Sequence, residues 1–300
     1  TIMQIKAWLE AFRLRTLPLA LASIGMGSFL AAAEGRFRLE IFLLCSLTTI
    51  FLQVLSNLAN DYGDSIHGAD SADREGPSRA VQSGAISSAA MKTALVVCAI
   101  FALASGSSLL YIADFQNLKI LGLFFGLGIA AIWAAITYTA GNNPYGYIGL
   151  GDISVFIFFG LLGVMGTFYL HTGLIEWHLV LPSFSCGFFS IAVLNVNNIR
   201  DISSDTKAGK RSIPVRLGRE KAVFYHWALL ASGFACALIF VLLTYSAWQQ
   251  LIFLATLPLL IRNGMAVSKY SQPKDLDPFL KQMALTTLFF VLTFGLGQVL

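Results

Sequence analysis

Residues 118–140 read LKILGLFFGLGIAAIWAAITYTA, a largely apolar run whose single charged residue is Lys119. About 20 apolar residues in a helix span the hydrocarbon core of a bilayer, so this run predicts a transmembrane helix. Composition extends the conclusion to the whole chain. Of its 300 residues, 56% are hydrophobic and only 12% are charged, whereas soluble domains carry about 25% charged residues. The chain is therefore predicted to be an all-α membrane protein.

Further apolar runs of similar length set the number of crossings. We expect nine transmembrane helices, at about 12–33, 40–60, 89–112, 118–140, 151–170, 178–199, 222–245, 248–267 and 281–300. Lysine and arginine gather on the cytoplasmic side of membrane proteins. With the N-terminus inside, only Arg36, Arg38 and Lys119 of the 20 basic residues fall on the other side. The start of the chain lacks the short apolar core of a cleavable signal, so a cytoplasmic N-terminus is expected.

Composition also narrows the classes of function. The four cysteines and four histidines are dispersed through the chain, without the paired spacing of a zinc site. The cysteines are interpreted as small buried hydrophobic residues. The net charge is +4, and no basic surface interleaved with aromatic residues is recognisable. We expect no nucleic-acid partner.

Two polar segments, at about 61–88 and 200–221, stand apart from the other loops. With the helix end before it, the first reads NLANDYGDSIHGADSADREGPSRA from Asn57, and the second reads NVNNIRDISSDTKAGKRSIPVRLG from Asn195. They follow the second and sixth predicted spans, so four crossings separate them and place them on the same, cytoplasmic, face. In each, an asparagine precedes an aspartate by four residues. A weak internal repeat is therefore expected, as in many membrane folds.

The acids and amides of these segments have helical spacing. Asn57, Asn60, Asp61 and Asp64 share one helix face if the second span continues. A second stripe, Asn197, Asp201 and Asp205 with Asn198 beside it, follows from the same rule. Such residues also cap helices, but acids packed together without a cation repel each other. Carboxylate and amide oxygens suit Mg²⁺, which shares itself with substrate phosphates. We therefore predict a site that holds a diphosphate through magnesium.

Basic residues follow each acidic stripe and could stabilise a departing diphosphate. They are Arg74 and Arg79 after the first, and Lys207, Lys210 and Arg211 after the second. Arg74 and Lys210 are the preferred catalytic candidates, although all five also fit ordinary cytoplasmic positive charge. Arg13, at the start of the first span, either reaches lipid head groups or points toward an anionic substrate.

A glycine- and tyrosine-rich segment, NNPYGYIGLGDIS at 142–154, is predicted on the same face. It could close over an aromatic substrate, with Tyr145 in contact and Asp152 as a hydrogen-bond acceptor. A turn with interfacial tyrosines explains the composition equally well. The segment lacks a GxGxxG phosphate-binding pattern.

Four motifs, in this order along the chain, carry a resemblance to a known family: NLANDYGDSIHGAD, DREGPSRAVQSG, YGYIGLGDISVFIFFG and VNNIRDISSDTKAGKRSIPVRLG. The sequence resembles the UbiA-type membrane prenyltransferases, and among them the branch acting on 1,4-dihydroxy-2-naphthoate. The resemblance implies nine helices around a central cavity. It also implies Mg²⁺-dependent transfer of a polyprenyl group from polyprenyl diphosphate to the naphthoate, with loss of CO₂, in a bacterial inner membrane. The product would be demethylmenaquinol, a menaquinone precursor.

The resemblance assigns roles to particular residues. It implies metal binding by Asn60, Asp61 and Asp64, with Asp64 also catalytic, and by Asp201 and Asp205, with Asp201 also catalytic. The general family pattern has another aspartate four residues after Asp64, where this sequence has Gly68. The naphthoate branch has the same shift, and Asp70 becomes the next metal candidate.

Two alternatives stay open at the level of sequence. The chain could be a UbiA-type enzyme for a different aromatic acceptor, or a secondary transporter that couples to cations through its acids. The residues 1–300 are expected to form a single membrane domain. Neither the length of the isoprenoid tail nor the oligomeric state follows from the sequence.

Overall fold

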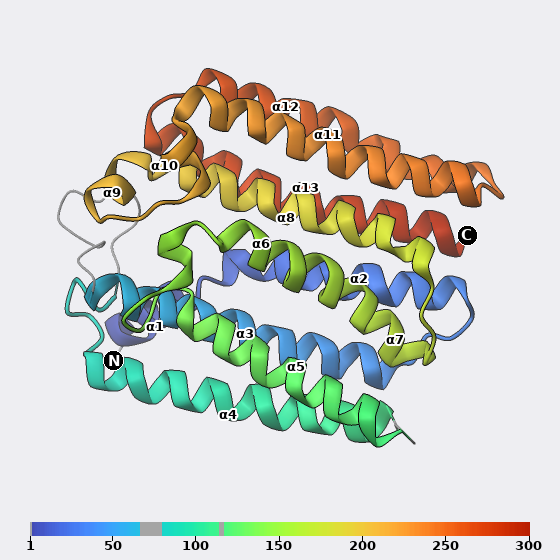
Figure 1. Cartoon of the computed structure of the whole chain (residues 1–300), viewed down its shortest axis with the longest axis horizontal. Coiled ribbons are helices and arrows are strands. Elements are labelled where there is room, and N and C mark those ends of the chain that lie inside the picture. The colour runs from blue at the N-terminus through green and yellow to red at the C-terminus, as the bar shows by residue number, and fades with distance from the viewer. Residues whose placement is uncertain (1, 67–79, 114–116) are drawn as a thin grey trace.

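The protein is described here by a computed structural model that covers residues 2–66, 80–113 and 117–300. Over these residues the regular structure is entirely helical. Within the described ranges, nine helical stretches are long and apolar enough to cross a membrane, which confirms the predicted number: Gln4–Ala33, Leu39–Ile66, Ser88–Ala113, Leu118–Thr137, Gly151–Thr172, Trp177–Arg200, Arg219–Thr244, Trp248–Lys269 and Pro273–Val299. They run roughly along the long axis of the molecule (Figure 1).

Several of these stretches contain more than one helical element. In chain order the elements are α1 (Ile2–Phe12), η1 (Leu14–Thr16), α2 (Leu17–Ala33), α3 (Leu39–Ile66), α4 (Ser88–Ala113), α5 (Leu118–Thr137), η2 (Tyr145–Ile148), α6 (Gly151–Val155), η3 (Phe156–Gly166), α7 (Thr167–Thr172), η4 (Trp177–Leu179), α8 (Val180–Arg200), α9 (Ile202–Lys207), α10 (Ile213–Leu217), α11 (Arg219–Thr244), η5 (Trp248–Thr256), α12 (Leu257–Lys269) and α13 (Pro273–Val299).

The first stretch is broken at Arg13. This residue has φ 48°, in the left-handed region that a non-glycine residue adopts infrequently. The break separates α1 from α2, and α1 packs against α3. Pro18 lies in the first turn of α2, where a missing N–H costs no helical hydrogen bond. The single helix predicted at 12–33 therefore has an additional helix before it.

Helix α3 extends to Ile66, six residues beyond the predicted end at 60. Asp61 and Asp64 consequently lie on the helix and not in the following loop. In this extension Gly63 lies against the backbone of Thr139, where any Cβ would collide. The second acidic segment is also helical. Asp201 ends α8, and the amide of Asp205 in α9 donates to the Asp201 carbonyl at 2.8 Å.

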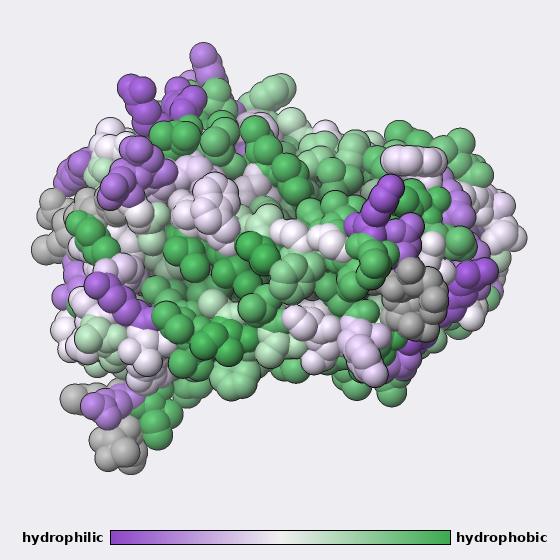
Figure 2. All heavy atoms as spheres, turned by 60° about the horizontal axis from the view of Figure 1, so that its bottom comes forward, coloured by the Kyte–Doolittle hydropathy of each residue, from purple (hydrophilic) through white to green (hydrophobic). Residues whose placement is uncertain are grey.

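Helix α8 is the most buried of the spanning stretches and packs against α11, η3 and α13. Aromatic rings fill the interface, with the Phe189 and Phe290 rings 5.0 Å apart and nearly perpendicular. Helices α4 and α5 instead expose apolar side chains such as Ile100 and Trp133. Figure 2 shows a broad hydrophobic band with hydrophilic residues gathered toward the two ends. Such a surface suits the hydrocarbon core of a bilayer, in which the helices satisfy their own backbone hydrogen bonds.

The middle of the fifth stretch, η3, is a π-helix over Phe156–Gly166. A π-helix of this length is rare, and π-helical turns are frequent at functional sites. Here η3 packs between α2 and α8. It forms one wall of a cavity that is also lined by residues of α2, α3, α5 and α8.

Candidate active site

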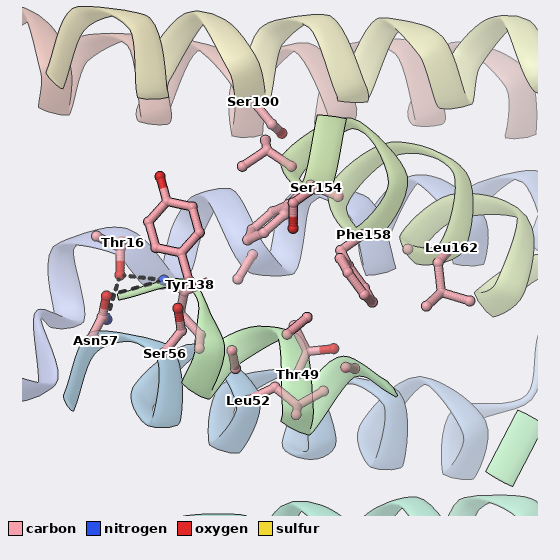
Figure 3. A pocket seen from close by; sticks show the side chains of 18 of the residues that line it. Thr16, Thr49, Leu52, Ser56, Asn57, Tyr138, Ser154, Phe158, Leu162 and Ser190 are labelled. Atoms are coloured by element: carbon pink, nitrogen blue, oxygen red, sulfur yellow. Dashed lines mark hydrogen bonds between the residues drawn. The ribbon is translucent and has the colours of Figure 1, made fainter. Parts of the chain in front are cut away.

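A cavity of about 450 Å³ lies among α2, α3, α5, η3 and α8. Its polar lining comes largely from the C-terminal ends of α3 and α8, from α9 and from the segment after α9: Asn57, Asn60, Asp64, Asn197, Asn198, Asp201, Asp205 and Lys210. Arg13 and Tyr145 also line it. Apolar residues cover the remainder, including Leu103, Leu110, Phe124, Phe125, Phe158 and Leu162. Figure 3 shows part of this lining, with side chains from opposite walls directed into the space. The cavity suits a ligand with one charged end and a long apolar part.

Lys210 joins the two acidic segments. Its ammonium nitrogen lies 3.0 Å from Asp64 Oδ1 and 3.6 Å from Asp205 Oδ1. Asp64 is 2% exposed and Asp205 is 8% exposed, so both carboxylates are largely shielded from water. One cation therefore contacts an acid from each of the two segments that the sequence predicted to face each other.

Burial raises the pKa of the Asp205 carboxyl to about 6. Lys210 opposes that rise, while the neighbouring carboxylates of Asp201 and Asp64 add to it. A carboxylate crowded by like charges and poorly hydrated gains stability from any further cation. The site is therefore built to attract positive charge.

The tyrosine-rich segment holds this arrangement in place. Tyr147 donates from its hydroxyl to Asp64 Oδ1 at 2.9 Å, and Lys210 Nζ lies 4.9 Å from the centre of the Tyr147 ring. The backbone amide of Arg211 donates to the Tyr147 carbonyl at 2.8 Å. Gly149 has φ 82°, and a Cβ there would lie 2.7 Å from the Arg211 carbonyl oxygen. Glycine is required here, because it accommodates both the left-handed backbone and the close approach.

Arg200 forms a buried ion-pair network behind the site. Its guanidinium donates to both oxygens of Asp201, at 2.7 and 2.8 Å, and to Asp277 Oδ1 at 2.5 Å. It also donates to Asn197 Oδ1 at 2.9 Å. The network fixes the end of α8 against α13. Asp201 lines the cavity, but its charge is already balanced by Arg200.

The asparagines have structural partners as well as cavity contacts. Asn57 donates from Nδ2 to the Phe12 carbonyl at 2.9 Å and to Thr16 Oγ1 at 3.0 Å, the latter drawn in Figure 3. It thereby fixes the turn that carries Arg13. Asn60 Oδ1 accepts a hydrogen bond from Thr139 at 2.9 Å. Both side chains line the cavity.

Four predicted residues lie away from the described cavity lining. Asp61 is turned toward the segment after the first loop, where Oδ2 accepts from the Ala80 amide at 3.0 Å and Oδ1 from the Val81 amide at 3.1 Å. Asp152 is buried and accepts from the Tyr225 hydroxyl at 2.7 Å. Lys207 and Arg211 have exposed side chains and are not among the lining residues. Asp70, Arg74 and Arg79 lie outside the described residues.

Other residues join the site that the sequence did not single out. They are Tyr138, Thr139, Tyr147, Ser204 and Ser212, with Arg200 and Asp277 behind them. Burial raises the pKa of the Tyr138 hydroxyl, which therefore stays protonated and able to donate. The tyrosine content of 138–147 was a usable signal. Asp277 offered none, because it is far along the chain from the acids it accompanies.

The donor set fits magnesium. Among the described residues, no three His, Cys, Asp or Glu side chains gather closely enough to hold a metal by themselves. Mg²⁺ uses one or two carboxylates and completes its octahedral shell with water and substrate phosphate. Asp64 and Asp205, each within 3.6 Å of a single ammonium nitrogen, supply such a pair of hard oxygen ligands. Asn60 adds a nearby amide oxygen on the same wall.

The class of protein, a membrane prenyltransferase, follows from the comparison with known families. Residues 20–294 match the UbiA prenyltransferase family, and the chain belongs to that family. This finding excludes the alternative that the chain is a secondary transporter. The family resemblance noted from the four sequence motifs is confirmed.

Individual relatives are closely similar. The 1,4-dihydroxy-2-naphthoate octaprenyltransferase of Haemophilus influenzae is 49% identical over 296 residues, covering 98% of this chain and 96% of the relative. The enzyme of the same name from Escherichia coli K12 is 45% identical, with 99% and 97% covered. A solved UbiA homolog from Archaeoglobus fulgidus, bound to GPP and Mg²⁺, superposes with a TM-score of 0.67 over 98% of this chain and 99% of the homolog. Its 17% identity makes this a likeness of fold.

Proposed function

We propose that this protein transfers a polyprenyl group from polyprenyl diphosphate to 1,4-dihydroxy-2-naphthoate in a Mg²⁺-dependent reaction. The observation that carries the proposal is a largely apolar cavity in which Asp64, Asp205 and Lys210 converge. The two relatives named for this reaction support the choice of acceptor. Both names specify an octaprenyl group, so octaprenyl diphosphate is the first donor to test.

Each residue has a role in the proposed reaction. Asp64 and Asp205, with Asn60 beside them, would hold the metal, which supplies positive charge that neutralises the departing diphosphate. Lys210 adds positive charge at the same place and stabilises the developing anion. Tyr147 keeps Asp64 in position through its hydroxyl. Arg200 balances Asp201 and keeps the end of α8 fixed.

Bond changes balance without a dedicated base. The bond between the prenyl carbon and the diphosphate oxygen breaks, and the prenyl carbon forms a bond to the electron-rich ring. The carboxylate leaves as CO₂ in place of a ring proton. The apolar lining excludes water from the allylic cation. Asp152 is not required as a base, which agrees with its contact to Tyr225 away from the cavity.

The protein is a multi-pass membrane protein, and we place it in a bacterial inner membrane with its N-terminus in the cytoplasm. The distribution of basic residues supports this orientation. Residues from Arg13 in the turn before η1 to Leu280 in α13 line one cavity. The whole chain, 1–300, is therefore proposed to act as one unit.

The deciding experiment incubates the purified protein with octaprenyl diphosphate, Mg²⁺ and 1,4-dihydroxy-2-naphthoate, and detects the prenylated product by mass spectrometry. Prenylation of 4-hydroxybenzoate or homogentisate in place of the naphthoate would overturn the acceptor assignment. Asp64→Ala and Asp205→Ala should each abolish measurable turnover at limiting Mg²⁺. Asp275→Ala, which removes an acid from the first turn of α13, is the matched control and should retain full turnover.

A further inference from the structure

Ser190 in α8 carries a buried hydroxyl that faces the cavity. The residue is 1% exposed, and its Oγ has no hydrogen-bond partner among the described residues. The large majority of buried polar side-chain atoms have such a partner, because leaving one unpaired is costly. Two other buried serines of α8 follow that rule. Ser183 donates to the Leu179 carbonyl at 2.7 Å, and Ser185 donates to the Gly233 carbonyl at 2.8 Å.

The position of Ser190 shows where a partner would have to be. Ser190, Asn197 and Asp201 all line the cavity. At 3.6 residues per turn they fall within about 40° of one another on α8, and Ser190 lies roughly 10 Å from Asn197 and roughly 16 Å from Asp201 along the axis. Ser190 therefore shares the cavity with the charged end but lies deeper. A ligand atom that pairs with this hydroxyl would therefore lie well beyond the diphosphate.

More hydroxyls line the cavity. Ser154 Oγ lies 2.9 Å from the Tyr145 hydroxyl, and the Tyr145 and Tyr138 rings meet edge to face at 5.3 Å. Figure 3 shows Ser190 and Ser154 extending into the cavity from α8 and α6, with the ring of Tyr138 on the side toward Asn57. These two helices pack against each other. Hydroxyls and aromatic faces together suit a flat, oxygen-bearing ring.

The chemistry of the two substrates decides between them. The polyprenyl tail is a hydrocarbon without hydrogen-bonding atoms, and the oxygens of the diphosphate belong at Lys210. The aromatic acceptor is the remaining source of a polar atom at this depth. We propose that the Ser190 hydroxyl binds an oxygen of the aromatic acceptor and sets the orientation of its ring, with Ser154 and Tyr138 completing the subsite. This inference rests on the proposed prenyl transfer.

Holding the ring by an oxygen far from the diphosphate has a kinetic consequence. A correctly oriented pair of reactants reacts much faster than a loosely held one. Ser190 contacts neither the metal ligands nor the donor in this scheme. Its loss should therefore weaken acceptor binding while leaving donor binding and magnesium dependence unchanged.

The test measures the KM of each substrate separately for Ser190→Ala and Ser190→Cys. A neutral hydrogen bond contributes enough to raise the acceptor KM about fivefold when it is lost, and the donor KM should stay within twofold. Ser190→Cys preserves the side-chain volume with a weaker donor, so it keeps the test valid if the alanine variant folds poorly. Ser183→Ala is the control, because Ser183 is buried on the same helix but its hydroxyl donates to the backbone carbonyl of Leu179. It should change neither KM.

Acceptor analogues identify the oxygen involved. Binding of 1-hydroxy-2-naphthoate and 1,4-dihydroxynaphthalene is compared with that of the full acceptor in the wild type and in Ser190→Ala. An analogue that lacks the oxygen contacted by Ser190 should bind equally well to both proteins. If both analogues bind more weakly to Ser190→Ala, the contact is to the C1 oxygen, which both of them keep. An acceptor KM within twofold of the wild type in both Ser190 variants, or an equal rise in Ser183→Ala, overturns the inference alone. A wild-type protein that does not prenylate the naphthoate overturns the proposed function and this inference together.

Discussion

Asp61 and Asp64 are neighbours in one motif, yet the structure gives them different tasks. Both oxygens of Asp61 accept backbone amides, from Ala80 at 3.0 Å and Val81 at 3.1 Å. Asp64 instead contacts Lys210 and Tyr147 at the cavity. We therefore predict that Asp61→Asn impairs stability and Asp64→Asn impairs magnesium use. The two substitutions remove the same charge from the same helix, so each serves as the control for the other.

The expected loss for Asp61→Asn follows from its two bonds. A hydrogen bond to a charged group contributes about 1.5–3 kcal/mol. Asparagine keeps one acceptor oxygen and places an NH₂ group against the second amide, so one bond is lost and the other becomes neutral. Asp61 is 2% exposed, and water cannot replace the missing partner. We expect the free energy of unfolding to fall by about 2–4 kcal/mol.

The assay combines unfolding in mixed detergent micelles with a magnesium titration of turnover, performed below the unfolding temperature. Asp61→Asn should unfold at a lower denaturant concentration and keep the wild-type magnesium requirement. Asp64→Asn should need at least tenfold more Mg²⁺ for half-maximal turnover. Wild-type stability of Asp61→Asn together with a raised magnesium requirement would show that Asp61 is a metal ligand and that the amide contacts are incidental.

Three further substitutions test the remaining parts of the site. Lys210→Met removes the cation next to the diphosphate, and initial rates at saturating substrates should fall at least a hundredfold; a loss below tenfold would exclude a direct role. Tyr147→Phe removes the bond to Asp64, so turnover should fall about threefold to tenfold with Mg²⁺ affinity reduced in parallel; unchanged magnesium titration would contradict this. Arg200→Met leaves Asp201 buried without a counter-charge and should cost about 3–5 kcal/mol of stability. Adding Asp201→Asn should restore much of that stability in the same unfolding assay, and no restoration would refute the ion-pair explanation.

The sequence predicted the features that depend on local composition. The nine crossings follow from hydropathy, which is averaged over about 20 residues and is insensitive to tertiary packing. The convergence of the two acidic segments followed from the even number of crossings between them. Asn60, Asp64, Asp205 and Lys210 are indeed placed together by the fold.

Features that depend on distant packing could not be predicted in this way. Arg200 fits the expected excess of cytoplasmic positive charge. In the structure, however, its guanidinium is buried and donates to Asp277, which is 77 residues away in the sequence. The sequence around Asp152 suggested a residue that binds substrate, yet Tyr225 of α11 donates its hydroxyl hydrogen to that carboxylate. In both cases the hydrogen-bond partner of a polar side chain comes from a distant helix, and no local sequence pattern specifies where that helix lies.

Helical periodicity explains why Asp61 points away from the cavity lining while its neighbours Asn60 and Asp64 belong to it. With about 100° per residue, Asn60 and Asp64 lie within about 40° of each other on α3, whereas Asp61 lies about 60° from Asp64 and about 100° from Asn60. The lining residues Gln53, Ser56, Asn57, Asn60 and Asp64 all fall on one side of the helix, and Asp61 lies just beyond the edge of that arc. The spacing is compatible with all four residues sharing one face, and only the amides of Ala80 and Val81 beside α3 show that Asp61 is engaged outside the cavity.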